Sequence, residues 1–107
     1  DKPFYLYLAK EVKKWKGKNV AVFCGATYPE ELGKIRQFFP MQPILTAGIG
    51  AQGGKAALAV KAGVNKDGMN LICNSSRSII YASDGKDFAQ AARKSANKLR
   101  EKINKYR

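Results

Sequence analysis

Four glycines lie close together between a short apolar segment and an alanine-rich one. They are Gly48, Gly50, Gly53 and Gly54. Glycine lets backbone N–H groups come close to an anion, and the positive end of a following helix dipole adds to the attraction. A tight turn with positive φ angles explains one or two such glycines, but not four within seven positions. The pattern therefore predicts an anion-binding loop.

A second polar group, Asn74-Ser75-Ser76-Arg77, follows the next apolar segment. The guanidinium of arginine is a planar fork that matches phosphate oxygens, and hydroxyl and backbone N–H groups can supplement it. A single arginine is more often part of a surface salt bridge. In (β/α)8 barrels, however, the loops after the last two strands form a recurrent phosphate site. Two adjacent loops suited to anions therefore favour phosphate binding.

A dinucleotide-binding fingerprint is the main alternative for the glycine loop. Residues 48–53 match the pattern G-x-G-x-x-G, follow an apolar segment and precede a helical one. That fingerprint also needs an acidic residue about 20 positions later, at the end of the next strand. Asp67 has the right separation but precedes the next expected strand, so it would face the opposite end of the sheet. Its placement argues against a dinucleotide site.

Acid–base and metal chemistry have few candidates in this sequence. It contains no histidine, and none of its eight acidic residues stands at the C-terminal end of an expected strand. No lysine ends a strand either, although general acid–base or Schiff-base catalysis needs such a group beside the substrate. We therefore expect no catalytic residue and no metal site in this chain. Cys24 and Cys73 lie in apolar segments without metal or disulfide spacing, which indicates small core residues and a reducing cytoplasm.

Helical and strand patterns alternate along the chain. Apolar residues at helical spacing predict helices over residues 3–16, 29–39, 55–62 and from about 84 to the C-terminus. Short apolar runs predict strands over residues 20–24, 43–46 and 70–73, and the continuous run over 20–24 is typical of a strand buried on both faces. A short turn or helix is expected over residues 78–82. The expected inward residues of the first and last helices are Tyr5, Leu8, Val12 and Trp15, and Phe88, Ala92, Ser95, Leu99 and Ile103.

Several residues have the types that begin or end helices. Gly17 is expected to end the first helix. Thr27 and Glu30 match a Thr-x-x-Glu capping box, and Pro29 suits the first turn of a helix. Asp84 is expected to cap the last helix. These signals divide the chain into alternating helices and strands.

The order helix, then three strand–helix units, predicts a parallel sheet with right-handed crossovers. Three strands cannot close a barrel, and as an open sheet they leave both edges unpaired. We therefore expect an α/β architecture that forms the C-terminal portion of a (β/α)8 TIM barrel: the last three βα units and a preceding helix. Residues 1–107 would be one segment of a single barrel domain whose N-terminal strands are absent from this chain.

The chain is strongly basic, with 20 lysines and arginines against eight acidic residues and a formal charge of +12. Such a charge attracts anions of every kind, so a small basic nucleic-acid-binding module is an alternative. That module would interleave basic and aromatic residues on one exposed surface. Here the aromatic residues fall mainly on expected inward faces, which does not favour nucleic acid as a partner. No apolar run is long enough to span a membrane.

Three motifs together resemble the C-terminal part of orotidine 5′-phosphate decarboxylases of the longer bacterial branch. They occur in order along the chain and are residues 24–32 (CGATYPEEL), 48–54 (GIGAQGG) and 74–83 (NSSRSIIYAS). The flanking segments, 3–15 and 87–104, also fit. Any one motif is weak evidence, but the three together are specific. The resemblance covers essentially the whole chain.

The resemblance implies a lyase of de novo pyrimidine biosynthesis that converts orotidine monophosphate to uridine monophosphate without a metal or cofactor. It implies that the catalytic Lys/Asp network lies on earlier strands, outside this chain. It also implies a cytoplasmic enzyme that is a homodimer at full length, with the missing N-terminal part of the barrel as this chain's partner. Another ribose-phosphate-binding barrel enzyme is the alternative that would share the same phosphate site.

The resemblance also assigns roles to particular residues. Gln52, the backbone N–H of Ser76 and the side chain of Arg77 match the residues that hold the substrate phosphate. The loop glycines Gly48, Gly50, Gly53 and Gly54 would support them. Ala47 stands beside the pyrimidine, at a position where the family usually has proline. An alanine in place of this proline would change the contact with the base and the rigidity of the loop.

Overall fold

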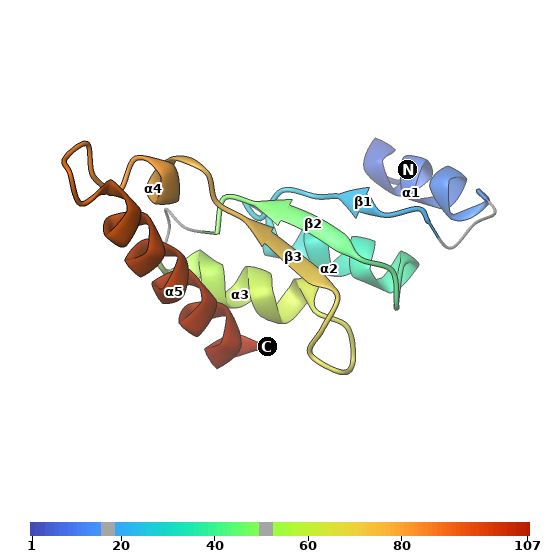
Figure 1. Ribbon diagram of the computed structural model, residues 1–107. Coiled ribbons are helices and arrows are strands. Elements are labelled where there is room, and N and C mark those ends of the chain that lie inside the picture. The colour runs from blue at the N-terminus through green and yellow to red at the C-terminus, as the bar shows by residue number, and fades with distance from the viewer. Residues whose placement is uncertain (16–18, 50–52) are drawn as a thin grey trace.

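The structure is a computed structural model that describes residues 1–15, 19–49 and 53–107. Helices and strands alternate along the chain as the sequence predicts (Figure 1). In chain order they are α1 (Phe4–Lys13), β1 (Val22–Phe23), α2 (Pro29–Phe38), β2 (Ile44–Ala47), α3 (Gly53–Gly63), β3 (Leu71–Asn74), α4 (Arg77–Ile80) and α5 (Phe88–Tyr106). None of the helices in this part of the chain is both long and apolar enough to cross a membrane.

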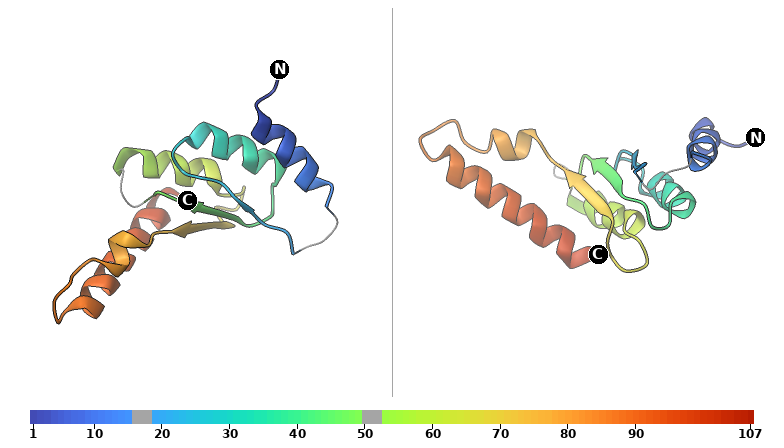
Figure 2. Two further views of the ribbon diagram at one scale, coloured as in Figure 1. Left: turned by 90° about the horizontal axis from the view of Figure 1, so that it is seen from above. Right: turned by 45° about the vertical axis from the view of Figure 1, so that its right-hand side comes forward.

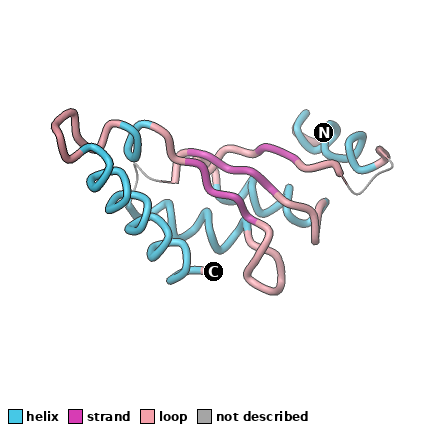
Figure 3. The backbone as a smooth tube through the Cα atoms, in the orientation of Figure 1, coloured by secondary structure: helices cyan, strands magenta, loops and turns pink. Residues whose placement is uncertain are grey.

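The three strands form one parallel sheet in the order β1-β2-β3 (Figure 3). Parallel neighbours that follow each other in sequence need a crossover helix, and α2 and α3 fill that role. Helices α1, α2, α3 and α5 lie beside one another in that order. The molecule is elongated, 51 × 27 × 26 Å, with α1 at one end and the loop between α4 and α5 at the other (Figure 2). The sheet and its helices thus form an open layer that does not close on itself.

The core lies between the sheet and the helices. Ile44 of β2 is fully buried against Leu32 of α2 and Ala59 and Val60 of α3. Gly33 of α2 faces Ala62 of α3, and a Cβ built at Gly33 would stand 3.7 Å from the Cβ of Ala62, an ordinary van der Waals contact. Gly33 and Ala62 thus lie at the contact between the two helices that cover β2.

The strands are buried on one face only, so the prediction of burial on both faces is wrong for this chain. The register aligns Phe23 with Leu45 and Leu45 with Ile72, which makes one row across the sheet. These three side chains are 65%, 38% and 56% exposed. The helices cover the opposite face, and no described segment covers this one. We call Phe23, Leu45 and Ile72 the apolar row.

Both expected helix-capping devices are wrong. Tyr28, with extended backbone angles, is the N-cap of α2, and no side chain caps the helix. Pro29 occupies the first helical position as expected, because its fixed φ suits that position. Asp87, not Asp84, is the N-cap of α5, and its carboxylate accepts a 2.6 Å hydrogen bond from Ser83 Oγ instead of capping the helix.

Several expected boundaries and inward positions also differ. Helix α1 ends at Lys13, and Gly17 lies outside the described residues. Strand β1 has two residues, and β3 begins at Leu71 because Asn70 adopts a left-handed φ of 62°. Leu8, Trp15 and Phe88 are more than half exposed, although they were expected to face inward. Leu8 and Trp15 do line a pocket between α1, β1 and α2, but they fill it only in part and stay exposed.

Arg36 is buried at the N-terminal ends of β2 and β3, with no carboxylate partner among the described residues. Its guanidinium donates to four backbone oxygens: Phe39 (2.8 Å), Gln42 (2.7 Å), Gly63 (2.7 Å) and Asn70 (2.7 Å). Burial lowers the pKa of the guanidinium from its ordinary value. These bonds join the end of α2, the approach to β2, the end of α3 and the start of β3. Arg36 thereby helps to fix the register that aligns the opposite ends of β2 and β3.

Candidate functional site

The two loops singled out in the sequence meet at the C-terminal ends of β2 and β3. Ala47 and Asn74, the last residues of these strands, are register partners. Beyond them lies a pocket of about 260 Å³, which we call the strand-end pocket. Its lining residues are Ala47, Gly48, Asn74, Ser75, Ser76, Arg77 and Ser78. The parallel sheet therefore brings the expected site residues Ala47, Gly48, Ser76 and Arg77 to one place.

Arg77 supplies the positive charge of the strand-end pocket. It is the first residue of α4 and its side chain is exposed. Within residues 1–15, 19–49 and 53–107 the sole ion pair joins Lys14 and Glu11, 2.6 Å apart. Arg77 thus has no carboxylate partner in the described structure, which removes the surface salt bridge as an explanation for it. An exposed guanidinium beside several hydroxyl groups can bind an anion.

Hydroxyl and amide groups hold the segment from Asn74 to Ser78 in shape. Asn74 Nδ2 donates to Ser76 Oγ at 3.4 Å, and the hydroxyl oxygens of Ser75 and Ser78 are 2.6 Å apart. Ser95 Oγ on α5 donates to the carbonyl oxygen of Ser78 at 2.7 Å. The helical spacing predicts Ser95 on the inward face of α5, but no motif in the sequence indicates that its hydroxyl reaches α4. These bonds position the loop that carries Arg77.

On the other wall, Gly48 has a left-handed φ of 92°. A Cβ built at Gly48 would meet nothing within 4 Å, so the backbone angle, not lack of space, favours glycine there. Gly53 begins α3 and Gly54 follows it within the helix. Gly50 and Gln52 lie outside the described residues. The expected contact of Gln52 with phosphate therefore stays a prediction.

Neither cysteine is suited to act as a nucleophile. Burial raises the pKa of Cys73, one residue before Asn74, to about 11. Burial and, secondly, the charge of Glu31 raise the pKa of Cys24. Neither thiol is in a disulfide, and because both pKa values are raised, both thiols are protonated at neutral pH. The described residues contain no group of three or more histidine, cysteine or acidic side chains that could hold a metal ion.

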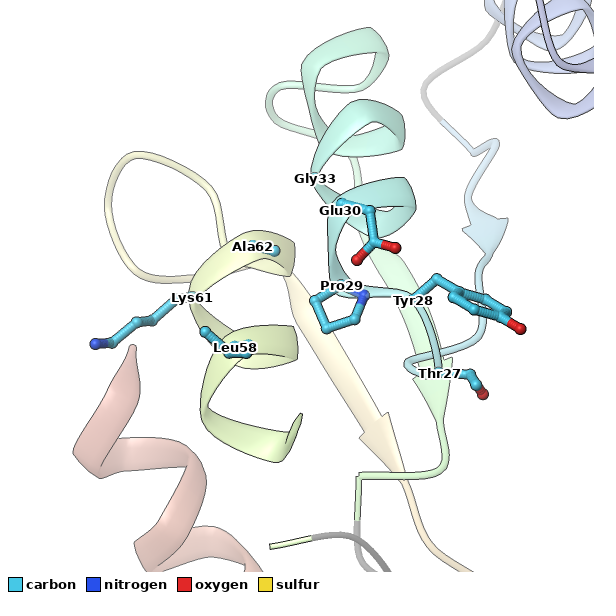
Figure 4. Close-up of a pocket in the computed structure, with 8 residues that line it drawn as sticks. All are labelled: Thr27, Tyr28, Pro29, Glu30, Gly33, Leu58, Lys61 and Ala62. Carbon is cyan, nitrogen blue, oxygen red and sulfur yellow. The ribbon is translucent and has the colours of Figure 1, made fainter. Parts of the chain in front are cut away.

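A larger groove, of about 700 Å³, lies between α2 and α3 on the helical layer (Figure 4). Pro29 and Leu58 face each other across it, while the phenol of Tyr28 and the ammonium of Lys61 point away to opposite sides. Lys61 Nζ instead lies 5.9 Å from the centre of the Tyr106 ring on α5. The groove is larger than the strand-end pocket, but its charged groups do not converge. The strand-end pocket is therefore the better candidate for an anion site.

The fold of the chain matches part of solved (β/α)8 barrel structures. An OMP decarboxylase from Leishmania donovani aligns with a TM-score of 0.74 and 26% identity, over 97% of this chain and 40% of that one. A UMP synthase from the same organism aligns with a TM-score of 0.78 and 33% identity, over all of this chain and 23% of that one. The three parallel βα units are thus a sector of such a barrel, as the sequence predicts.

The curated relatives that match the chain are orotidine 5′-phosphate decarboxylases. The orotidine 5′-phosphate decarboxylase of Cupriavidus metallidurans is 46% identical over 108 residues, which cover 99% of this chain and 40% of that protein. No protein-family model matches the chain. The chain is a homologue of orotidine 5′-phosphate decarboxylases and corresponds to part of such a protein. It spans about 40% of the length of the curated relatives it matches.

Proposed function

We propose that this chain is the C-terminal, phosphate-binding part of an orotidine 5′-phosphate decarboxylase, which converts orotidine monophosphate to uridine monophosphate and CO2. One observation carries the proposal. The strand-end pocket combines the Gly48 turn of one loop with the serines and the ion-pair-free Arg77 of the next. Loops after neighbouring strands at this end of a barrel are where substrate phosphates bind.

Charge and hydrogen-bonding capacity support a phosphate as the ligand. Arg77 offers a charge-assisted fork, and the backbone N–H of Ser76 is the donor that the family resemblance assigns beside it. Gln52 would complete the set from the glycine loop. None of the described residues that line the strand-end pocket carries a carboxylate, so no negatively charged side chain among them would repel an anion. A phosphate, the most highly charged part of the substrate, fits this chemistry best.

The proposal divides the work between two parts of one barrel domain. Residues 1–107 would hold the phosphate, and the strands missing from this chain would supply the Lys/Asp network that acts on the pyrimidine carboxylate. Contacts to a remote phosphate can accelerate catalysis when their binding energy orders groups at the reacting carbon. The chain alone would then be inactive. The complete protein would act as a homodimer.

A hybrid enzyme tests this division. In it, residues 1–107 replace the aligned segment of the Cupriavidus metallidurans relative, which is 40% of that protein. We expect the hybrid to form uridine monophosphate, and the 107-residue chain alone to form none. Two results would overturn the proposal: turnover by the purified chain alone, or a folded hybrid that binds uridine monophosphate but shows no turnover.

A further inference from the structure

Helix α4 carries Arg77 but is too short to fix its own position. It has four residues, and its N-cap residue, Ser76, makes no capping hydrogen bond through its side chain. Short helices gain little from their own hydrogen bonds, because nucleating the first turn is costly. The position of α4 therefore depends on contacts with other elements, and α5 is its neighbour.

Ser95 provides a polar contact between α5 and α4. Its hydroxyl donates to the carbonyl oxygen of Ser78 at 2.7 Å. At the C-terminal end of α4, the carbonyl oxygen of Arg77 accepts a hydrogen bond from the N–H of Tyr81. The carbonyl oxygen of Ile79 accepts one from the N–H of Ala82. The last carbonyls of a helix have no partner within it and need one from outside. Ser95 supplies that partner for Ser78.

The direction of this hydrogen bond is informative about Ser95. A serine inside a helix usually bonds back to the carbonyl one turn earlier, and alanine is the better helix former at such a position. Ser95 lies in the middle of α5, yet its hydroxyl bonds to a different helix. Ser78 in turn has its own hydroxyl 2.6 Å from that of Ser75 in the strand-end pocket. A continuous set of contacts thus runs from α5 to the pocket.

We propose that Ser95 is a positioning residue for the phosphate site, which acts by holding α4 so that Arg77 and Ser76 face the substrate phosphate. This inference rests on the function proposed above. Ser95 does not line the strand-end pocket, so its effect on phosphate binding must pass through the Ser78 carbonyl. Loss of one neutral hydrogen bond should raise the KM for orotidine monophosphate by about three- to tenfold.

The experiment uses the hybrid enzyme and three substitutions. Ser95→Ala removes the hydrogen bond, and Ser95→Thr keeps a hydroxyl at the same position. Ser83→Ala is the matched control, because it also removes one serine hydroxyl, but one that bonds to Asp87 and Gly85 outside the pocket. Kinetics are measured with orotidine monophosphate and with orotidine, which lacks the phosphate. We expect Ser95→Ala to raise the KM for orotidine monophosphate but not for orotidine. Ser95→Thr and Ser83→Ala should leave both KM values unchanged.

A double-substitution cycle separates this inference from the proposed function. In an Arg77→Ala background, Ser95→Ala should raise KM less than it does in the parent enzyme, because the Arg77 contact is already lost and only the contact of the Ser76 N–H remains to be disturbed. Equal effects of Ser95→Ala on both substrates, or full additivity with Arg77→Ala, would overturn the positioning role. The proposed function fails separately, if Arg77→Ala itself does not distinguish the two substrates.

A second measurement uses the hybrid enzyme and inorganic phosphate as the probe. Amide resonances of Ser76 and Arg77 report binding as phosphate is added. We expect Ser95→Ala to raise the apparent Kd for phosphate by about three- to tenfold, and Ser95→Thr to keep the Kd of the parent protein. Unchanged affinity in Ser95→Ala would overturn the inference.

Discussion

Ala47 and Asn74 are register partners at the last positions of β2 and β3. Each leads directly into one wall of the strand-end pocket, Ala47 into the Gly48 turn and Asn74 into the segment that carries Arg77. A shift of one residue between these strands would turn Asn74 to the other face of the sheet and separate the two walls. The register of β2 and β3 is thus the structural requirement of the site, and Arg36 helps to fix it at the opposite end of the sheet.

Arg36→Met in the hybrid enzyme should lower the free energy of unfolding by about 3–5 kcal/mol. Methionine keeps much of the side-chain volume but removes the guanidinium donor from four backbone oxygens, of which Asn70 O keeps the N–H of Ile44. Hydrogen bonds to charged groups are the stronger ones. Urea denaturation measures the change. Arg93→Met, on the exposed side of α5, is the control and should change little. A loss below about 1 kcal/mol for Arg36→Met would show that these bonds do not hold the strands.

Thr46→Val should stabilise the hybrid enzyme or leave its stability unchanged. Thr46 is fully buried in β2, and its hydroxyl has no hydrogen-bond partner within the described structure. Valine has nearly the same shape, and removing an unsatisfied buried hydroxyl can gain about 1–3 kcal/mol. Thermal unfolding measures the difference, with Thr27→Val at an exposed position as the control. Destabilisation by Thr46→Val would mean that the hydroxyl has a partner.

The apolar row should make the isolated chain self-associate. Phe23, Leu45 and Ile72 expose a continuous apolar strip that no described segment covers. Ile72→Glu should therefore reduce self-association in sedimentation experiments at several concentrations. Leu58→Glu, equally exposed but on the helical layer, should not. In the hybrid enzyme the two substitutions are compared by their effect on stability, because there the apolar row would face the barrel interior. There Ile72→Glu should be the more destabilising change, and equal tolerance of both would contradict the barrel assignment.

The stability of the chain should fall between pH 9 and pH 11, in part because of Cys73. Burial raises the pKa of its thiol from the ordinary value of 9.0 to about 11. In that window the folded state keeps a proton that the unfolded chain has lost, so this contribution is full below pH 9 and disappears as the pH rises. Cys73→Ala should give a shallower decline of the urea midpoint across the window. Identical slopes for the two proteins would contradict a raised pKa.

The alternation of elements and the meeting of two loops could be predicted, because apolar periodicity and the direction of parallel strands determine them. The helix starts were less predictable. Tyr28 and Asp87 take the N-cap positions because the backbone path into each helix, which sequence spacing does not reveal, decides the cap. The contacts of Arg36 and Ser95 could not be predicted either. Each joins elements that are distant in the sequence, and each partner is a backbone carbonyl that no motif marks.

The most direct measurement compares Arg77→Ala on two substrates in the hybrid enzyme, with Arg93→Ala as a control for loss of a positive charge. A lost hydrogen bond to a charged group costs about 1.5–3 kcal/mol, so kcat/KM for orotidine monophosphate should fall roughly ten- to a hundredfold or more. For orotidine, which has no phosphate to hold, kcat/KM should stay nearly unchanged. Equal losses on both substrates would make Arg77 a structural residue and would place the phosphate site elsewhere.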